Sequence, residues 1–333
     1  MARGWLRERG MALAASALIV AVSVVGMSAC ALGEVPSRVA GPMPRYDHIF
    51  VIVMENSSYD DIIGSGDAPR INALANEYGQ ATNYWGVTHP SEPNYVAMIG
   101  GDSYGIKDDN SYTVNALTEQ NLATQLEAAG LTWKSYQQSL PYPGFTGETY
   151  PSGGALYASK HNPFMNFLGA WPASEQQAAL ARNVPDTQLA RDLASGAVPN
   201  FAFISPDLCH DMHGAPSCDS DLRRTGDTYV GDTVDEIMRS SVWQTGNTAI
   251  VITWDETDAE LSFGAPNIAA DGGHVPTVVI TNHGPRGAHD ALPYNHFALL
   301  LTIQDAFGLG CLRNSCPETG NISPMTPLFA LVS

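Results

Sequence analysis

The sequence predicts an α/β fold: a three-layer α/β/α sandwich around a mostly parallel central sheet. Two observations lead to this prediction. Continuous apolar runs, typical of strands buried on both faces, span residues 48–54, 200–205, 248–254 and 277–281. Between and around them, apolar residues recur at spacings of three and four, as in amphipathic helices, over residues 69–78, 118–129, 227–238 and 295–307. Strands alternating with helices favour a parallel sheet covered on both faces.

The composition agrees with a globular enzyme. The chain has 333 residues, of which 44% are hydrophobic and 15% charged, with 31 Gly and 22 Pro. This is enough apolar material for a large core, and it argues against a disordered or coiled-coil chain. The formal net charge of −18 would repel a polyphosphate backbone, so nucleic acid is excluded as a scaffold partner. No feature of the sequence indicates an oligomeric state.

The first 29 residues have the features of a secretory signal peptide. Three arginines precede an apolar run over residues 11–25, which is too short and wrongly flanked for a stable membrane span. The sequence Met-Ser-Ala-Cys at 27–30 resembles a bacterial lipobox. We therefore expect residues 30–46 to form a lipidated N-terminus and a flexible tether, with the lipid anchor on Cys30.

Ordinary signal-peptidase cleavage near Cys30 is the alternative to the lipid anchor. Both interpretations predict export, either to the outer face of the cell membrane as a lipoprotein or as a secreted protein. We expect residues 47–333 to form one catalytic domain. A stretch rich in Gly, Pro and aromatic residues, 136–171, is expected to be an ordered insertion or a lid near the site.

Four cysteines remain after Cys30, in two close pairs. An oxidising compartment favours local disulfides, which would join Cys209 to Cys218 and Cys311 to Cys316. A cysteine-rich zinc site is the alternative, although neither pair has the usual zinc spacing.

Polar residues follow the predicted strands at their carboxyl ends, where active residues of such folds lie. Glu55 and Asn56 come directly after the first strand, and Asp255 and Glu256 come after the strand at 248–254. Two adjacent carboxylates repel each other unless a cation lies beside them. A polar strand end and a surface acidic pair are the alternatives.

Histidines and carboxylates also gather after the strand at 200–205. Asp207, His210, Asp211 and His213 lie within seven residues, a mixture that suits a transition metal or a phosphate-contacting acid. Spacing alone leaves open whether His210 with Asp207 or His213 with Asp211 is the site pair. We expect His161, His283 and His289 to have a core or surface role. We expect His296 to be a buried hydrogen-bonding residue.

Ser91 lies in a segment that predicts the start of a helix. Pro93 suits the first turn, and Ser91 falls at or near the N-cap. The same geometry would place its hydroxyl beside free N–H groups and the positive helix end, where a phosphoryl oxyanion binds. Asn94 could donate to a phosphoryl oxygen from the first turn. A serine that only caps the helix is the alternative, since a serine is a poor nucleophile unless a base or metal lowers its pKa.

Five motifs together resemble the bacterial phosphoesterase family, which includes acid phosphatases and phospholipases C with the alkaline-phosphatase fold. In chain order they are Val53-Met54-Glu55-Asn56, His89-Pro90-Ser91-Glu92-Pro93-Asn94-Tyr95, His210-Asp211-Met212-His213, Trp254-Asp255-Glu256 and Gly272-Gly273-His274-Val275-Pro276. The matches span about residues 47–308, which is nearly the whole mature chain. The resemblance implies an alkaline-phosphatase-like fold.

The resemblance also implies roles for individual residues. Ser91 matches the nucleophile. The residues that look like ligands of a metal shared with Ser91 are Glu55, Asn56, Asp255 and Glu256. Those that look like the other half of the site, which contacts phosphate or holds a second metal, are Asp211, His213 and His274. The cofactor is a divalent ion, calcium, magnesium or zinc; glutamate and amide ligands favour a hard ion such as calcium or magnesium.

The expected function is metal-dependent hydrolysis of phosphate monoesters through a phosphoserine on Ser91. Asn94 and His213 would stabilise the phosphoryl oxygens, and His274 or its neighbour would assist the leaving group. The substrate would be a small phosphorylated molecule or a lipid phosphoester. A phosphodiesterase of the phospholipase C type is one alternative. A surface binding protein that has lost catalysis is another, although the presence of Ser91 with Glu55 and Asp255 argues against it.

Overall fold

The computed structural model describes residues 42–218, 220–258, 264–265 and 267–331. The predicted signal peptide, the predicted lipid anchor at Cys30 and the tether up to residue 41 lie outside the described residues. The fold below is that of the compact unit that begins at residue 40. Among the described residues, no helix has both the length and the apolar character needed to cross a membrane.

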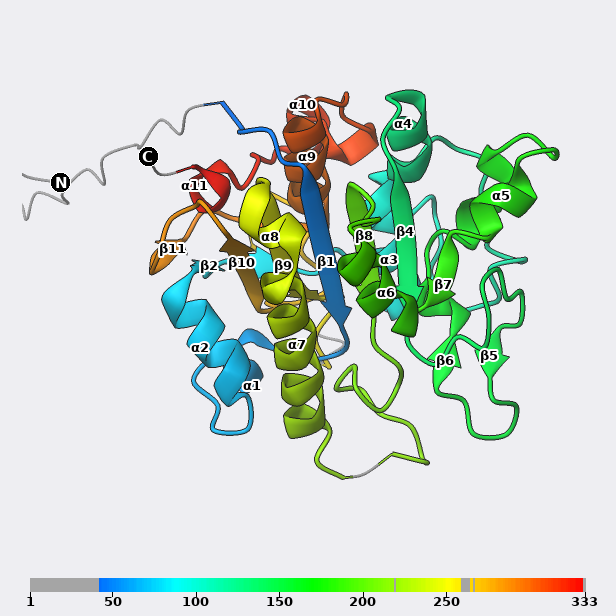
Figure 1. The fold of residues 1–333 in the computed structure, drawn as a ribbon, viewed down its shortest axis with the longest axis horizontal. Coiled ribbons are helices and arrows are strands. Elements are labelled where there is room, and N and C mark those ends of the chain that lie inside the picture. Colours follow the sequence, from blue (N-terminus) through cyan, green and yellow to red (C-terminus); the bar gives the residue numbers. More distant parts are fainter. Residues whose placement is uncertain (1–41, 219, 259–263, 266, 332–333) are drawn as a thin grey trace, which may run out of the picture. The chain divides into compact units, whose positions relative to one another are not determined.

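An eight-stranded sheet forms the centre of this unit, in the order β11-β2-β10-β9-β1-β8-β4-β7 (Figure 1). Its strands are β1 (His48–Met54), β2 (Gly79–Ala81), β4 (Trp133–Gln137), β7 (Asn183–Pro185), β8 (Phe201–Ser205), β9 (Thr248–Trp254), β10 (Thr277–Thr281) and β11 (Ala288–Asp290). β1 pairs in parallel with both β8 and β9, so that Val51 lies opposite Phe203 and Val251. β10 runs antiparallel to its neighbours β9 and β2. The prediction of a mostly parallel sheet is confirmed.

The four predicted strands are present because their sequences leave no polar face. Every residue from Ile49 to Met54 is at most 2% exposed, and β9 and β10 are buried throughout. A strand covered on both faces needs apolar side chains at successive positions. β4 was not predicted, because its sequence contains polar residues whose partners are distant in the chain. Lys134 pairs with Asp192, and Ser135 donates to Asn162.

Helices cover both faces of the sheet, which confirms the three-layer arrangement (Figure 1). On one face, contacts join α3 (Ser91–Gly100), α4 (Leu122–Ala128) and α9 (His296–Phe307). On the other, contacts join α2 (Pro69–Glu77), α7 (Leu222–Arg239), α8 (Ser241–Thr245) and α6 (Thr187–Ser195). The shorter elements are α1 (Tyr59–Ile62), β3 (Tyr84–Trp85), β5 (Thr149–Tyr150), β6 (Tyr157–Ala158), η1 (Ser159–His161), η2 (Asn166–Ala170), α5 (Gln176–Leu180), β12 (Tyr294–Asn295), η3 (Arg313–Ser315), α10 (Pro317–Gly320) and α11 (Thr326–Phe329).

Capping explains why α4 begins later than predicted. α4 begins at Leu122 and not at residue 118, because the Asn121 side chain accepts from the N–H groups of Ala123 and Thr124. The Thr124 hydroxyl in turn accepts from the N–H of Asn121, which completes a capping box. α7 extends back to Leu222, five residues before the predicted start.

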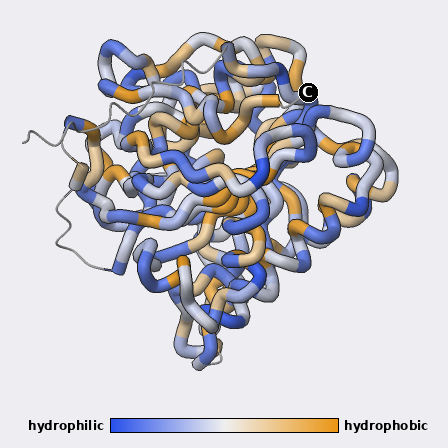
Figure 2. Tube along the Cα trace, turned by 90° about the vertical axis from the view of Figure 1, so that its left-hand side faces the viewer, coloured by the Kyte–Doolittle hydropathy of each residue, from blue (hydrophilic) through white to orange (hydrophobic). Residues whose placement is uncertain are grey.

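The carboxyl ends of β1, β8 and β9 meet at one edge of the sheet, because the three strands are parallel neighbours. Figure 2 shows apolar segments in the interior and polar segments around them. Glu55 directly follows β1, Asp207 closely follows β8, and Asp255 directly follows β9. The polar residues that end these buried strands are therefore brought together.

Two further predictions can be compared with the fold. Both predicted disulfides are present, Cys209–Cys218 and Cys311–Cys316, which excludes the cysteine zinc site. The segment 136–171 is ordered, but it begins inside β4 of the central sheet and is only in part an insertion.

Candidate active site

Ser91 is the first residue of α3, and its hydroxyl lies between two carboxylates. Pro90 takes the N-cap position, so the serine lies one residue inside the predicted cap. Its Oγ lies 3.1 Å from Oε2 of Glu55 and 3.1 Å from Oε1 of Glu256. One hydroxyl proton can serve only one acceptor at a time. Oε1 of Glu256 has a second donor, Nδ2 of Asn56 at 3.5 Å, so the proton of Ser91 is available to Glu55.

The carboxylates around Ser91 are buried together at two neighbouring strand ends. Glu55 and Asp255 are fully buried. Asn56 joins them, because its backbone N–H donates to Oδ1 of Asp255 at 3.1 Å and its Nδ2 lies 3.5 Å from Oε1 of Glu256. Burial and then the charge of Asp255 raise the pKa of Glu55, and burial and then the charge of Glu256 raise the pKa of Asp255. Such a cluster is stable only when protons or a cation offset the repulsion.

His161 is a buried residue that the sequence analysis had given only a core or surface role. Its Nε2 lies 3.2 Å from Oε1 of Glu55, and its Nδ1 lies 3.8 Å from Oδ2 of Asp211. The ring stacks on Tyr95 with the centroids 5.2 Å apart. Burial and then the charge of Lys160 lower the pKa of His161, so the imidazole is neutral. Its segment carries no helix or strand periodicity, which is why the sequence did not place it beside Glu55.

The oxygens around Ser91 fit a divalent cation. Several buried oxygens lack a hydrogen-bond partner, namely Oε1 of Glu55, Oδ1 of Asn56, Oδ2 of Asp211 and Oδ2 of Asp255. Unpaired buried carboxylate oxygens are costly, and carboxylate and amide oxygens are the ligands of hard divalent ions. Among the described residues, no three His, Cys, Asp or Glu side chains form a ready-made metal cluster. The predicted ligand set also relies on the amide of Asn56 and the hydroxyl of Ser91.

Asn94 has a different role from the one predicted. Its Oδ1 accepts from the N–H groups of Val87 and Thr88 at 2.9 and 3.1 Å, and its Nδ2 donates to the carbonyls of Thr88 and Pro90 at 2.7 and 3.1 Å. Both amide donors are therefore committed to the turn before α3. Asn94 positions this turn and has no donor left for a phosphoryl oxygen. The turn also brings Nδ1 of His89 against Oε2 of Glu256, a contact that the sequence analysis did not foresee.

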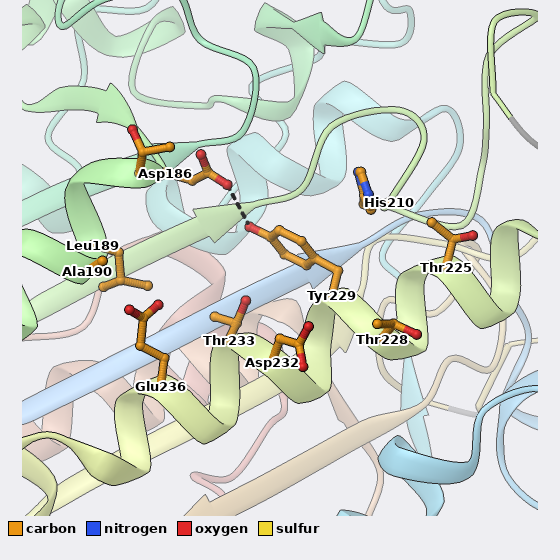
Figure 3. Close-up of a pocket in the computed structure, with 11 residues that line it drawn as sticks. Asp186, Leu189, Ala190, His210, Thr225, Thr228, Tyr229, Asp232, Thr233 and Glu236 are labelled. Atoms are coloured by element: carbon orange, nitrogen blue, oxygen red, sulfur yellow. Dashed lines mark hydrogen bonds between the residues drawn. The ribbon is translucent and has the colours of Figure 1, made fainter.

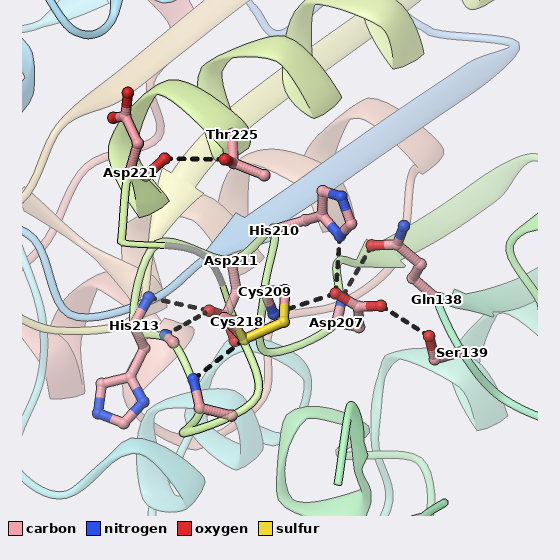
Figure 4. The surroundings of a disulfide bond; sticks show 12 residues. Gln138, Ser139, Asp207, Cys209, His210, Asp211, His213, Cys218, Asp221 and Thr225 are labelled. Carbon is pink, nitrogen blue, oxygen red and sulfur yellow. Dashed lines mark hydrogen bonds and ion pairs between the residues drawn. A yellow bond between two sulfur atoms is a disulfide. The ribbon is translucent and has the colours of Figure 1, made fainter. Parts of the chain in front are cut away.

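The structure separates the two Asp/His pairs that spacing left open. His210 and Asp207 pair with each other at 2.7 Å, and Asp207 also accepts from Ser139 at 2.6 Å (Figure 4). Asp211 lies instead beside His161, and its carbonyl accepts from the N–H of Glu55 at 2.8 Å. Burial raises the pKa of Asp211 to about 7. Asp211 is thus the carboxylate of this segment that lies next to His161 and the backbone of Glu55.

The Asp207–His210 pair borders a different cavity. His210 lines a space of about 490 Å³ between α6 and α7. Tyr229 crosses this space and lies 3.5 Å from a carboxylate oxygen of Asp186 (Figure 3).

His213 and His274, the other two predicted histidines, lie in different surroundings. His213 has an exposed side chain and lines a cavity with Lys160. His274 stacks between Tyr59 and Trp85, with centroid distances of 4.5 and 5.1 Å. Its Nε2 lies 3.1 Å from the carbonyl of Thr82, which makes Nε2 the protonated nitrogen.

The predicted role of His274 as a donor to the leaving group stays a prediction. Its Nε2–H faces the carbonyl of Thr82, so only Nδ1 is left to carry a proton to or from a ligand. Burial lowers the pKa of His274. His296 is buried, with its Nε2 2.6 Å from the carbonyl of Asp255, as predicted for a hydrogen-bonding residue.

Comparison with known proteins identifies the family. The model of the Phosphoesterase family matches residues 65–310. The chain belongs to the Phosphoesterase family. It is therefore a phosphoric ester hydrolase, as the five motifs implied.

Three similar proteins are named as phosphatases. A phosphatidylinositol-3-phosphatase from Mycobacterium tuberculosis is 29% identical over 322 residues, covering 93% of this chain and 94% of the relative. A probable acid phosphatase from Kluyveromyces lactis is 29% identical over 83% of this chain, and an acid phosphatase from Aspergillus fumigatus is 28% identical over 80%. The chain spans 61% and 56% of these two longer fungal proteins.

Solved structures show the same fold. A protein in the alkaline phosphatase superfamily from Vibrio parahaemolyticus aligns with a TM-score of 0.52 and 16% identity, covering 80% of this chain and 67% of that chain. A protein from a glycosaminoglycan-metabolism locus of Bacteroides thetaiotaomicron aligns with a TM-score of 0.54 and 14% identity, covering 86% and 82%. At such identities the likeness concerns the fold, and it confirms the alkaline-phosphatase-like fold.

Proposed function

We propose that this phosphoesterase hydrolyses phosphate monoesters through a phosphoserine on Ser91. The observation that carries the proposal is the position of the Ser91 hydroxyl, 3.1 Å from both Glu55 and Glu256 at the start of a ten-residue helix. Phosphorus would form a bond to Oγ while the bond to the leaving oxygen breaks. The Ser91 proton would pass to Glu55 or Glu256, and the leaving oxygen would take a proton from water and depart as an alcohol. Water would then attack the phosphoserine and release phosphate.

The residues around Ser91 would orient the reaction. Glu55 and Glu256 hold the hydroxyl, and either can receive its proton. The positive end of α3 favours negative charge on the phosphoryl group. His213, which is exposed and lines a cavity with Lys160, would donate to a phosphoryl oxygen. His161 keeps the Glu55 carboxylate in place.

We further propose that a divalent cation is bound by the oxygens that lack partners. Its ligands would be Glu55, Asn56, Ser91, Asp255 and Glu256, with Asp211 nearby. When bound, such an ion lowers the pKa of a coordinated hydroxyl and offsets the charge on phosphate. Oxygen ligands favour calcium or magnesium over zinc.

Monoesters are favoured over diesters because the similar proteins named above are phosphatases, one of them acting on a phosphoinositide by its name. A phosphodiesterase of the phospholipase C type is the second candidate. The substrate would be a small phosphorylated molecule or a lipid phosphoester. The two disulfides support export, and a lipid anchor on Cys30 would hold the enzyme at the membrane surface.

The proposal is tested by measuring turnover and metal content together. Phenyl phosphate and bis(4-nitrophenyl) phosphate are compared as substrates, with and without chelator. Ser91→Ala should lose on the order of a thousandfold in kcat because the covalent path disappears. It should keep most of its metal, because a neutral hydroxyl contributes little to holding the ion. Glu55→Gln should lose both activity and metal, because it removes a ligand charge.

The buried serine Ser240, which donates to the carbonyl of Ile237, supplies the control variant Ser240→Ala, which should retain activity. Near wild-type turnover by Ser91→Ala would overturn the phosphoserine mechanism. Faster cleavage of the diester than the monoester would favour the second candidate. Full activity after exhaustive chelation would rule out the proposed role of a divalent cation.

A further inference from the structure

Lys160 lies at the edge of the carboxylate cluster and is linked to the helix of the nucleophile. Its Nζ lies 2.6 Å from Oδ2 of Asp109, with a quarter of the lysine side chain exposed. The other oxygen of Asp109, Oδ1, accepts from the backbone N–H of Glu92 at 3.0 Å. Glu92 follows Ser91 in the first turn of α3. Asp109 therefore ties the ammonium group to the start of that helix.

The charge of Lys160 acts on the site itself. Burial opposes the charged form, but the charge of Glu55 and the hydrogen bond to Asp109 outweigh it and raise the pKa of Lys160. The side chain is therefore an ammonium group at every physiological pH. An ammonium group has three N–H donors, and Asp109 takes one of them. Two remain for the oxygens of a ligand.

The first turn of α3 offers a phosphate fewer donors than its position suggests. The N–H of Glu92 is taken by Asp109, and Pro93 has none. Because the surrounding groups are mostly carboxylates, an anionic substrate needs a further positive group. Lys160 supplies that charge from the chain itself.

A cavity of about 650 Å³ adjoins Lys160. Small and apolar residues make up most of its lining, which consists of Gly153, Gly154, Ala155, Lys160, Leu208, His213, Gly214, Ala215, Pro216 and Ser217. None of these described residues is acidic. Two segments that line this cavity also reach the carboxylates around Ser91. Lys160 precedes His161, whose Nε2 lies 3.2 Å from Oε1 of Glu55, and His213 lies two residues after Asp211.

A second cavity near the site has the opposite character. It measures about 230 Å³ and is lined by His274 together with three aspartates, Asp60, Asp61 and Asp258. Although Asp61 is paired with Arg223, the remaining excess of carboxylates would repel a phosphate ester. Electrostatics therefore favour the cavity beside Lys160 for the substrate.

We propose that Lys160 binds a non-reacting oxygen of the substrate's phosphate and that the cavity beside it takes an uncharged, largely apolar leaving group. This inference rests on the proposed function, since it assigns the substrate class of the same site. Asp109 acts through Lys160 and is a positioning residue. The leaving group would be an alkyl, aryl or acylglycerol alcohol.

Binding of inorganic phosphate to the metal-loaded protein tests the role of Lys160 without turnover. Isothermal titration should give an affinity on the order of 10- to 100-fold weaker for Lys160→Met, because a hydrogen bond to a charged group is lost. Lys160→Gln should weaken binding in the same direction while keeping a donor for Asp109. Lys160→Arg should retain binding within about tenfold, since it keeps the charge.

Lys134 provides a matched control. It forms a similar ion pair, 2.5 Å from Asp192, and its side chain is exposed to a similar degree, 27% against 25%. Lys134→Met should bind phosphate like the wild type. Phosphate affinity of both Lys160→Met and Lys160→Gln within twofold of the wild type would overturn the assignment. This result is distinguishable from failure of the phosphoserine mechanism, which depends only on Ser91→Ala turnover.

The leaving-group assignment needs no variant. Primary n-alkyl phosphates from propyl to heptyl share nearly the same leaving-group chemistry and differ in apolar length. We expect kcat/KM to rise about two- to fourfold per methylene until the cavity is filled, since each buried methylene favours binding by about 0.8 kcal/mol. A flat or falling series would overturn the apolar leaving-group pocket.

Discussion

Nε2 of His161 lies 3.2 Å from Oε1 of Glu55, while Oε2 of the same carboxylate faces the Ser91 hydroxyl. The imidazole therefore lies against the Glu55 oxygen that faces away from the Ser91 hydroxyl. Substitution of a residue that orients a metal ligand typically lowers metal affinity or activity by about 10- to 100-fold. Their removal should leave the fold intact when the shape of the side chain is kept.

We expect His161→Phe to lower kcat and metal affinity by about 10- to 100-fold, because the ring can still stack on Tyr95 but no longer contacts Glu55. Steady-state kinetics and metal titration measure the two effects. His289→Phe, at an exposed position of β11, is the control and should change neither. If His161→Phe matches the wild type in both measurements, the ring is only a packing element.

Asn94→Ala should destabilise the protein by about 2–4 kcal/mol, because the N–H groups of Val87 and Thr88 lose a buried acceptor. Urea denaturation measures the change. Asn110→Ala, in an exposed loop, should stay within about 0.5 kcal/mol of the wild type. A variant of unchanged stability that binds phosphate poorly would instead support direct donation by Asn94.

The Asp207–His210 pair should make stability depend on pH. The hydrogen bond to Asp207 raises the pKa of His210. The contribution of His210 to the free energy of unfolding is therefore complete below its unfolded pKa of about 6.5, and it is lost as pH rises through the folded pKa. Although burial opposes it, hydrogen bonding to His210 and Ser139 lowers the pKa of Asp207. The contribution of Asp207 to the free energy of unfolding is complete above about pH 4, and it is lost as pH falls through the lower folded pKa.

His210→Asn should therefore lower the melting temperature most between about pH 4 and 6.5. The difference from the wild type should shrink as pH rises through the raised folded pKa of His210, because the imidazole then becomes neutral in the folded state too. Thermal unfolding of both proteins across this range provides the measurement. A difference that stays constant with pH would show that the charged pair does not contribute.

The Cys209–Cys218 disulfide encloses residues 214–217, which form one wall of the cavity beside Lys160. The double variant Cys209→Ser/Cys218→Ser should lose about 2–3 kcal/mol of stability and raise KM for hexyl phosphate. The double variant Cys311→Ser/Cys316→Ser is the control, since it removes a disulfide outside the cavity lining and should leave KM unchanged. Equal KM values in the two double variants would show that the Cys209–Cys218 disulfide does not affect substrate binding.

The sequence alone predicted four strands of the central sheet, β1, β8, β9 and β10, and the carboxylates that follow two of them. The strands could be predicted because a strand buried on both faces has to be apolar along its whole length, as from Ile49 to Met54. The meeting of Glu55 and Asp255 could be predicted because parallel neighbouring strands end at the same edge. The position of Ser91 followed from the proline and cap pattern at the start of α3.

The tertiary structure decided the roles of residues outside these regular elements. His161 and Lys160 lie in a segment without periodicity, so only long-range contacts with Glu55 and Asp109 fix their places. The same holds for the choice between Asp211 and Asp207, which lie four residues apart. A sequence pattern reports which face of a helix or strand is buried; a side chain on a loop is placed by partners far away in the chain, and those become known only when the chain is folded.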